Sequence, residues 1–212
     1  IIKAMSGNSH EKTFARFRST EAGQKILREK RNLLSTLLNR QALQEALGKV
    51  NHENDNEPCL GDMYLKFVES EKITADGLVE ASRMEDVIED PDSRLFAERM
   101  RDQHDLWHVT TGYGRDTFGE ACLLAFTYAQ TKNRGLGIIA LVGMIKISKE
   151  LGPDVKKAMW QAYKAGKRAA WLPTQDWEAL LLQPIDEVRK QLNITAPIKY
   201  REVFNLYQLA HA

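Results

Sequence analysis

The side chains with the clearest chemical potential lie near the middle of the chain. His104 and His108 are four residues apart, and Asp105 lies between them. On an α-helix, residues four apart lie one turn above each other, so both imidazoles would face the same way. Two imidazoles at this spacing can bind one metal ion. Asp105 is rotated by about 100° from His104, so its carboxylate can reach the edge of the same site.

Glu120 is the acidic side chain that would complete this ligand set. It follows a glycine-containing turn and would lie on the next helix. Two imidazoles with one or two carboxylates suit Zn, Mn, Co or Fe(II). If a coordination position stays open, such an ion can act as a Lewis acid on a bound substrate oxygen. We therefore expect a metal site formed by His104, Asp105, His108 and Glu120.

Each of these residues also has a plain structural explanation. Thr117-Phe-Gly-Glu120 matches a capping box, in which the glutamate accepts a hydrogen bond from the N-cap amide. Asp105 can orient an imidazole instead of binding the ion. His-Asp pairs also occur in metal phosphohydrolases, but those enzymes need further His and Asp ligands from separate helices. The spacing alone leaves metal binding and helix capping open. The other histidines are His10, His52 and His211.

The helices that must position these residues can be predicted along the whole chain. Apolar residues recur at helical spacing after the N-cap residue Thr20 and predict one helix over residues 21–47, ended by Gly48. Asp90-Pro91 provides an N-cap acceptor and a first-turn proline, which predicts a helix from there to about Thr111. Further helices are expected over residues 61–71, 74–84, 117–132, 135–151 and 154–170, with short ones after Pro173 and Pro184.

No sustained two-residue alternation of apolar and polar side chains occurs, so strands are not expected. The predicted fold class is all-α, a single-domain helical bundle over residues 1–212. The composition agrees, because 43% of the residues are hydrophobic and 28% are charged. A formal net charge of +1 lacks the global basic character of nucleic-acid-binding proteins, so no nucleic-acid partner is expected.

Cysteine use and hydropathy bear on the compartment. Cys59 and Cys122 belong to no metal or disulfide framework, and such sparse use suits a reducing, intracellular compartment. No apolar run reaches the roughly 18 residues that a membrane-spanning helix needs. The longest candidate, residues 135–147, is too short.

Two further segments each allow two interpretations. Between Lys156 and Trp171, basic and aromatic residues alternate at helical spacing, so this face is either solvated or lies against an anionic membrane surface or a phosphate. Between Leu123 and Ile147, apolar residues would line two consecutive helices. They form either a packed core or a groove for a long prenyl chain.

The histidine motif resembles the signature of the "Coq-four" family of ubiquinone (coenzyme Q) biosynthesis proteins. The shared pattern is H-D-x-x-H, then eleven residues, then Glu, from His104 to Glu120. The likeness continues at Ala165-Gly-Lys-Arg-Ala169 and through residues 184–197, so residues 90–197 carry the family-like core. Near Glu29-Lys-Arg31 the chain lacks a proline that the family leads us to expect.

The resemblance implies a helical fold and a divalent metal ion, zinc or else Fe, Mn or Co, bound by His104, Asp105, His108 and Glu120. It implies that these residues catalyse a lyase reaction, the oxidative decarboxylation at C1 of a polyprenylated 4-hydroxybenzoate-type precursor with replacement by hydroxyl. The alternative is a non-catalytic scaffold that binds the prenyl lipid and organises a quinone biosynthesis complex. A metal-dependent hydrolase ranks third.

The resemblance also implies partners and a location. The expected partners are a polyprenylated aromatic lipid, other quinone biosynthesis proteins and a peripheral membrane contact, and a homodimer is compatible with them. The protein would then act at the cytoplasmic face of the inner membrane in a bacterium, or at the matrix side of the mitochondrial inner membrane in a eukaryote.

Overall fold

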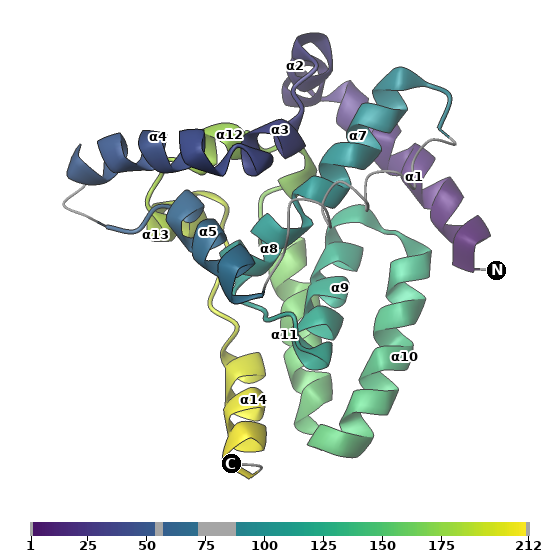
Figure 1. Ribbon diagram of the computed structural model, residues 1–212. Coiled ribbons are helices and arrows are strands. Elements are labelled where there is room, and N and C mark those ends of the chain that lie inside the picture. Colours follow the sequence, from purple (N-terminus) through teal and green to yellow (C-terminus); the bar gives the residue numbers. More distant parts are fainter. Residues whose placement is uncertain (1, 54–56, 72–87, 211–212) are drawn as a thin grey trace. The chain divides into compact units, whose positions relative to one another are not determined.

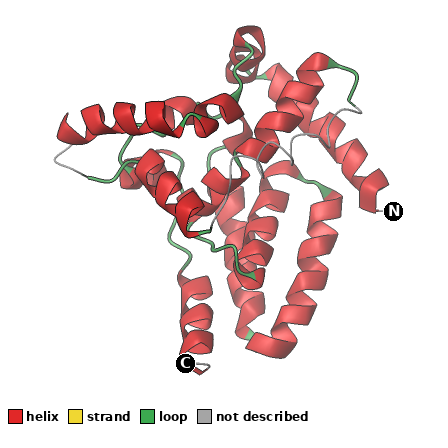
Figure 2. Ribbon diagram, viewed as in Figure 1, coloured by secondary structure: helices red, strands yellow, loops and turns green. Residues whose placement is uncertain are grey.

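The computed structural model describes residues 2–53, 57–71 and 88–210 of the chain (Figure 1). Within these residues the regular structure is helical, and no strand is formed (Figure 2). A single isolated β-bridge joins Cys59 and Pro184 in the described part of the chain. The predicted all-α class is therefore confirmed. The helix expected over residues 74–84 falls outside the described residues.

The chain divides into two compact units, each built from segments that are distant in sequence. Unit 1 consists of Ile1–Thr13, Thr111–Leu172 and Gln191–Ala212. Unit 2 consists of Phe14–Thr110 and Pro173–Lys190. The assignment of residues 1–212 to one domain stays a prediction.

Unit 2 contains most of the short helices. Its core includes the fully buried aromatic rings of Phe17, Phe96, Trp107 and Trp177. Phe96 packs against Phe17 with ring centroids 4.8 Å apart. Its helices are α2 (Glu21–Glu29), α3 (Leu33–Leu38), α4 (Arg40–Glu53), α5 (Leu60–Ser70), α7 (Pro91–Asp102), α8 (His104–Thr111, whose last residue belongs to unit 1), α12 (Trp177–Leu180) and α13 (Ile185–Gln191).

The single helix expected over residues 21–47 is wrong, because the chain breaks it twice. Lys30 adopts a left-handed conformation with φ 49° and ends α2. Asn32 then caps α3 by accepting a hydrogen bond from the Ser35 amide. Asn39 ends α3, and its side chain accepts from the Ala42 amide in the first turn of α4. Short polar side chains of this type compete for backbone groups and favour helix ends.

Two other predicted boundaries also shift. Gly48 does not end its helix, since α4 continues to Glu53. The start at Asp90-Pro91 is confirmed, because the Asp90 carboxylate accepts from the Ser93 amide. The helix that begins there does not reach Thr111 unbroken. It ends at Asp102, and α8 begins at His104 after the single residue Gln103.

Unit 1 is dominated by long helices. These are α9 (Thr117–Thr131), α10 (Arg134–Leu151), α11 (Asp154–Arg168) and α14 (Ile198–Ala210), with the first part of α1 (Ile2–Ser19). The α9 and α11 helices approach closely, because a Cβ on Gly166 would lie 2.5 Å from the Phe126 carbonyl oxygen. Neither α1 nor α14 was expected from the sequence pattern, whereas the helices over 117–132, 135–151 and 154–170 are confirmed within two residues.

Two expectations about the compartment can be compared with the structure. Cys59 and Cys122 are both buried and form no disulfide. Among the described residues, no helix combines the length and hydrophobicity that crossing a membrane requires.

Candidate metal centre

The two histidines project from α8, whose other face anchors it in unit 2. Leu106 and Trp107 are 0% and 2% exposed. The imidazole rings of His104 and His108 have centroids 4.8 Å apart and planes at 80° to each other. Their ligand nitrogens lie within 4.8 Å of one another. The predicted spacing thus places both imidazoles on the same face of one helix.

The two imidazoles differ in burial. His108 is 1% exposed, as expected for a residue on an inward stripe. The His104 side chain is 42% exposed, so the prediction that both rings point inward holds for His108 alone. The difference follows from the break at Gln103, because His104 is the first residue of a new helix instead of an interior residue of a long one. The pair therefore has one buried and one accessible imidazole.

Helix α5 provides the surroundings of the buried imidazole. The Phe67 ring stacks on the His108 ring with centroids 5.7 Å apart and planes at 23°. One turn earlier, Tyr64 is 0% exposed. Burial, with a further contribution from Asp105, raises the pKa of the Tyr64 hydroxyl, which therefore stays protonated at neutral pH. The sequence analysis missed both aromatic residues, since nothing in their spacing links α5 to α8.

The C-terminal end of α8 is held by a cation. Arg189 of α13 donates from Nε to the Thr110 carbonyl at 3.0 Å and from a terminal nitrogen to the Val109 carbonyl at 3.2 Å. These carbonyls belong to the last turn, where no intrahelical donor remains and where a positive charge is favourable. Thr110 also donates from its hydroxyl to the Leu106 carbonyl. The helix that carries the histidines is thus fixed at its end.

The start of α8 is fixed through Gln103. The Trp177 indole donates to the Gln103 side-chain carbonyl at 2.6 Å in a buried hydrogen bond. The Gln103 backbone carbonyl accepts from the Trp107 amide at 3.0 Å, which closes the first turn of α8. A ligand pair on a helix held at both ends keeps its geometry with little conformational freedom to lose on binding.

Asp105 lies beside His104. One of its carboxylate oxygens is 3.7 Å from His104 Nδ1, and its side chain is 16% exposed. This distance allows a charge interaction but is too long for a hydrogen bond. Among the described residues, the group of side chains suited to one metal ion comprises His104, His108 and Glu120 and does not include Asp105. Its assignment as a ligand stays a prediction.

Glu120 lies in unit 1, in the first turn of α9, and is partly buried. The capping box expected between Thr117 and Glu120 is wrong. The N-cap is Asp116, whose Oδ1 accepts from the amides of Phe118 and Gly119 at 3.1 and 3.0 Å. Glu120 therefore has no capping function in α9. The main structural alternative to its role as a ligand is removed.

The turn before α9 has a conformation that few sequences can adopt. Gly112 has φ +77°, a region that favours glycine. A Cβ on Gly119 would lie 2.2 Å from the Gly114 carbonyl oxygen, so glycine is required there as well. The Tyr200 hydroxyl of α14 accepts from the Gly114 amide at 3.2 Å and donates to the Asp116 carboxylate. The start of α9, and with it Glu120, is thus fixed within unit 1.

The donor types fit a transition-metal ion. Imidazole nitrogens suit Zn, Fe, Mn and Co, and a carboxylate suits the same ions, whereas Ca²⁺ and Mg²⁺ prefer oxygen ligands. Neither cysteine belongs to the candidate group, so a thiolate site of the structural zinc type is not indicated. Three protein ligands would leave coordination positions for a substrate or water.

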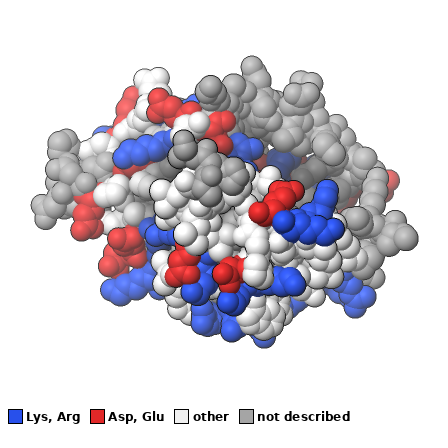
Figure 3. All heavy atoms as spheres, turned by 90° about the horizontal axis from the view of Figure 1, so that it is seen from below, with Lys and Arg blue, Asp and Glu red and all other residues white. Residues whose placement is uncertain are grey.

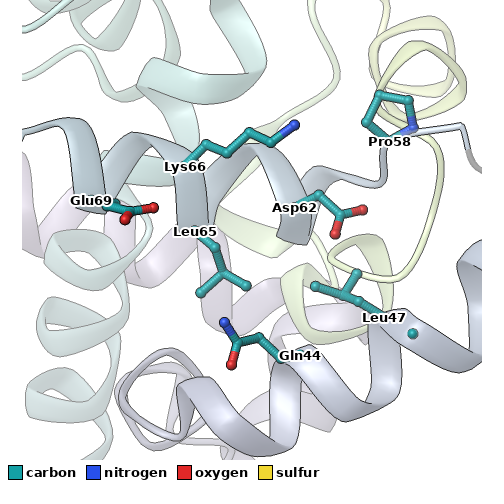
Figure 4. Close-up of a pocket in the computed structure, with 8 residues that line it drawn as sticks. Gln44, Leu47, Pro58, Asp62, Leu65, Lys66 and Glu69 are labelled. Atoms are coloured by element: carbon teal, nitrogen blue, oxygen red, sulfur yellow. The ribbon is translucent and has the colours of Figure 1, made fainter.

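A groove of about 440 Å³ lies elsewhere in unit 2, between α4 and α5 (Figure 4). Its lining mixes charged and apolar side chains, and Asp62 already accepts from the Cys59 amide at 2.8 Å. None of the apolar residues 123–147 lines it, so it does not match the prenyl groove considered from the sequence. The lining residues are Gln44, Leu47, Gly48, Pro58, Asp62, Leu65, Lys66 and Glu69.

Comparison with protein families gives one match that covers most of the chain. The family model described as "Coenzyme Q (ubiquinone) biosynthesis protein Coq4" matches residues 4–198. This range contains the histidine pair, Glu120 and the segment 184–197. The match supports the resemblance that the motif and these segments indicate.

Curated relatives carry the same description. A mitochondrial ubiquinone biosynthesis protein COQ4 from Podospora anserina is 28% identical over 87% of this chain and 57% of its own length. A mitochondrial COQ4 homologue from Aedes aegypti is 29% identical over 84% of this chain and 60% of its own length. The chain thus spans a little over half the length of these relatives.

A solved structure shares the fold. A crystal structure of a Nostoc punctiforme protein assigned to ubiquinone biosynthesis superposes with a TM-score of 0.52. The match covers 90% of this chain and 97% of the other, at 20% sequence identity. At this identity the likeness supports the helical fold alone.

Proposed function

Because the chain belongs to the Coq4 family of coenzyme Q (ubiquinone) biosynthesis proteins, we propose that it acts in that pathway as a metal-dependent decarboxylase. The proposed substrate is a polyprenylated 4-hydroxybenzoate-type ring, and the product carries a hydroxyl at C1. The observation that supports this proposal best is the histidine pair of α8, with ring centroids 4.8 Å apart on a helix fixed at both ends.

The proposed reaction exchanges one substituent at C1. The bond between C1 and the carboxylate carbon breaks, carbon dioxide leaves, and a C–O bond forms at the same ring carbon. Replacing a carboxylate by a hydroxyl removes two electrons from the substrate, and we propose dioxygen as the oxidant. A bound divalent ion would supply Lewis-acid stabilisation of the negative charge on the substrate oxygens.

The side chains of this protein would have distinct tasks. His104, His108 and Glu120 would hold the ion, zinc or else iron, manganese or cobalt. Phe67 fixes the plane of the His108 ring by stacking on it. Asp105, 3.7 Å from His104 Nδ1, would favour the orientation of that imidazole in which Nε2 binds the ion. The exposed edge of His104 is the side from which a ring carboxylate can approach.

The ligand assignment can be tested by metal content. Elemental analysis of untagged protein should find bound transition metal in the wild type and in a Phe118→Leu control. The variants His108→Ala and Glu120→Gln should lose it while keeping wild-type helical circular dichroism. Full metal occupancy in His108→Ala would contradict the assignment.

The catalytic assignment needs a separate assay. Purified protein, metal, dioxygen and a prenylated hydroxybenzoate labelled with ¹³C in the carboxylate should release labelled carbon dioxide, and a chelator should stop the release. The alternative is a non-catalytic scaffold that organises other quinone biosynthesis proteins around the prenyl lipid. Tight binding of the prenylated substrate without release of label would favour the scaffold.

The family also bears on partners and location. We propose that the protein associates with other quinone biosynthesis proteins and contacts the membrane peripherally. The named relatives are mitochondrial proteins. By the same argument this chain would act beside a quinone-producing membrane, on the matrix side in a mitochondrion or the cytoplasmic side in a bacterium.

A further inference from the structure

Helix α10 exposes a row of large apolar side chains to solvent. Leu141, Val142 and Ile145 are 53%, 51% and 51% exposed, and Ile139 is 41% exposed. The residues of α10 that are buried, such as Ala140 and Ile147, lie on the opposite side of the helix. The apolar residues between 123 and 147 therefore do not all pack into a core, and those of α10 form a surface.

This apolar surface is unusual for its continuity. Single exposed apolar residues are common on soluble proteins, but several on one helix face mark an interaction site. Successive members lie three and four residues apart, at positions 138, 141, 142 and 145, so they form one stripe along α10. The stripe lies entirely within unit 1.

The neighbouring helix α11 adds an exposed indole among lysines. Trp160 is 58% exposed and stacks on Tyr163 with ring centroids 5.3 Å apart. The Lys164 ammonium lies 5.5 Å from the Trp160 ring centroid. Lys167 lies 6.0 Å from the Tyr163 ring centroid. The expectation that Trp160 packs into the core is therefore wrong, because it is a surface residue within a basic face.

The segment from Arg134 to Arg168 is strongly basic. It contains eight Lys and Arg residues and two acidic residues, Glu150 and Asp154, which gives a net charge of 8 − 2 = +6 in a chain of net charge +1. All ten charged side chains are exposed. Figure 3 shows Lys and Arg side chains gathered around uncharged ones along the lower edge of the face in view. The positive charge of the chain is thus concentrated on these two helices.

We propose that the exposed face of α10 and α11 is a docking surface for an anionic lipid membrane. Apolar side chains would enter the boundary between headgroups and acyl chains, with Trp160 at headgroup level and the lysines against lipid phosphates. Charge complementarity selects this occupant over a second copy of the chain, because two faces of charge +6 would repel each other. The α10–α11 face is defined here by Leu141, Val142, Ile145, Trp160, Lys164 and Lys167.

Vesicle binding tests the proposal without reference to the metal. The full chain is mixed with phosphatidylcholine vesicles containing either no phosphatidylglycerol or about 30 mol % of it, and co-sedimentation gives the partition constant. The wild type should bind the anionic vesicles and release on addition of salt, and should bind the neutral vesicles weakly. Lys164→Gln with Lys167→Gln should weaken anionic binding about fivefold for each lysine removed.

The apolar contribution has its own variant and a matched control. Leu141→Ser with Val142→Ser and Ile145→Ser should weaken binding at least tenfold. The control is Leu206→Ser with Leu209→Ser on α14, where the wild-type side chains are 68% and 78% exposed but lie outside the basic segment. This control should bind like the wild type. Metal content and circular dichroism should stay unchanged in all three variants, so a failure here is distinct from a failure of the metal proposal.

Three results would overturn the proposal. The first is no preference of the wild type for anionic vesicles. The second is an equal loss of binding in the α14 control, which would make the interaction generic. The third is a dimer that the α10 variant converts to a monomer, measured by analytical ultracentrifugation, with vesicle binding unchanged, since the face would then belong to a second copy.

Discussion

Helices α8 and α10 depart from ordinary burial in opposite ways. Helix α8 buries polar side chains, with His108 and Thr110 at 1% and 0% exposure. Helix α10 exposes apolar ones, with Leu141 and Ile145 at 53% and 51%. Both departures cost free energy in an isolated chain, because buried polar groups lose water and exposed apolar groups order it. Such costs are retained where another component offsets them.

The comparison teaches that the two helices need different components. A buried imidazole is stabilised by a metal ion, by a hydrogen-bond partner or by both. An exposed apolar stripe is stabilised by lipid or protein that covers it. The proposed metal and the proposed membrane surface thus account for the two helices separately, and each can fail without the other.

The largest contrast should appear in unfolding free energy. Leu106→Ala removes a fully buried side chain from α8 and should lower the free energy of unfolding by about 2–5 kcal/mol. Leu141→Ala removes an exposed one from α10 and should change it by less than about 0.5 kcal/mol. Urea denaturation followed by circular dichroism measures both. Similar losses in the two variants would mean that the α10 stripe packs against the protein in solution.

A smaller effect should sharpen the account of α8. Phe67→Leu keeps an apolar side chain beside His108 but removes the stacked ring, so the imidazole loses part of its orientation. Metal affinity should fall about tenfold, as found when groups that orient a ligand are replaced. Competition with a chromophoric chelator measures it.

The matched control for Phe67 lies on the same helix. Leu65 points into the groove between α4 and α5 (Figure 4). Leu65→Met should therefore leave metal affinity unchanged. A loss in Leu65→Met equal to that in Phe67→Leu would show that any change in α5 disturbs the site.

The smallest effect concerns the charged surroundings of unit 2. Arg31 donates two hydrogen bonds to Asp176, at 2.7 and 2.6 Å, and this interaction lowers the pKa of the Asp176 carboxyl. A lowered folded-state pKa contributes stability above the unfolded value of about 4, and that stability is lost as the pH falls through the folded value. Since the side chain is 44% exposed, we expect less than about 1 kcal/mol.

Thermal denaturation should show this pH dependence. The wild type should exceed Asp176→Asn by a constant margin from about pH 7 to 5, and the margin should shrink below about pH 4. Leu141→Ala on α10 should follow the wild type across the same range. A margin that grows as the pH falls would contradict the sign of the shift.

Local sequence patterns predicted the helices that carry the site better than the contacts between them. The cap at Asp90 and the helices over 117–131 and 154–168 follow from spacing and N-cap chemistry. The breaks at Lys30 and Gln103 do not, because helix propensity is a weak signal that tertiary contacts override. The Gln103 break is held by the Trp177 indole, which is distant in sequence.

The candidate site divides in the same way. The spacing of His104 and His108 was sufficient to predict a shared face, since it depends on helix geometry alone. Phe67 and Arg189 were not predicted, because their contacts with α8 depend on the packing of α5 and α13. The capping role proposed for Glu120 failed because Asp116, one residue before the expected N-cap, has the shorter reach to the first amides.

The amino-acid sequence by itself determined the helical class, the paired imidazoles and the family, because these depend on short-range periodicity and on residue identity. Tertiary structure alone decided which apolar residues are core and which are surface. Helix periodicity gives the relative direction of side chains around an axis but not which direction faces a neighbour. For α10 that choice turned an expected core into an exposed stripe, and for α8 it buried His108 and left His104 accessible.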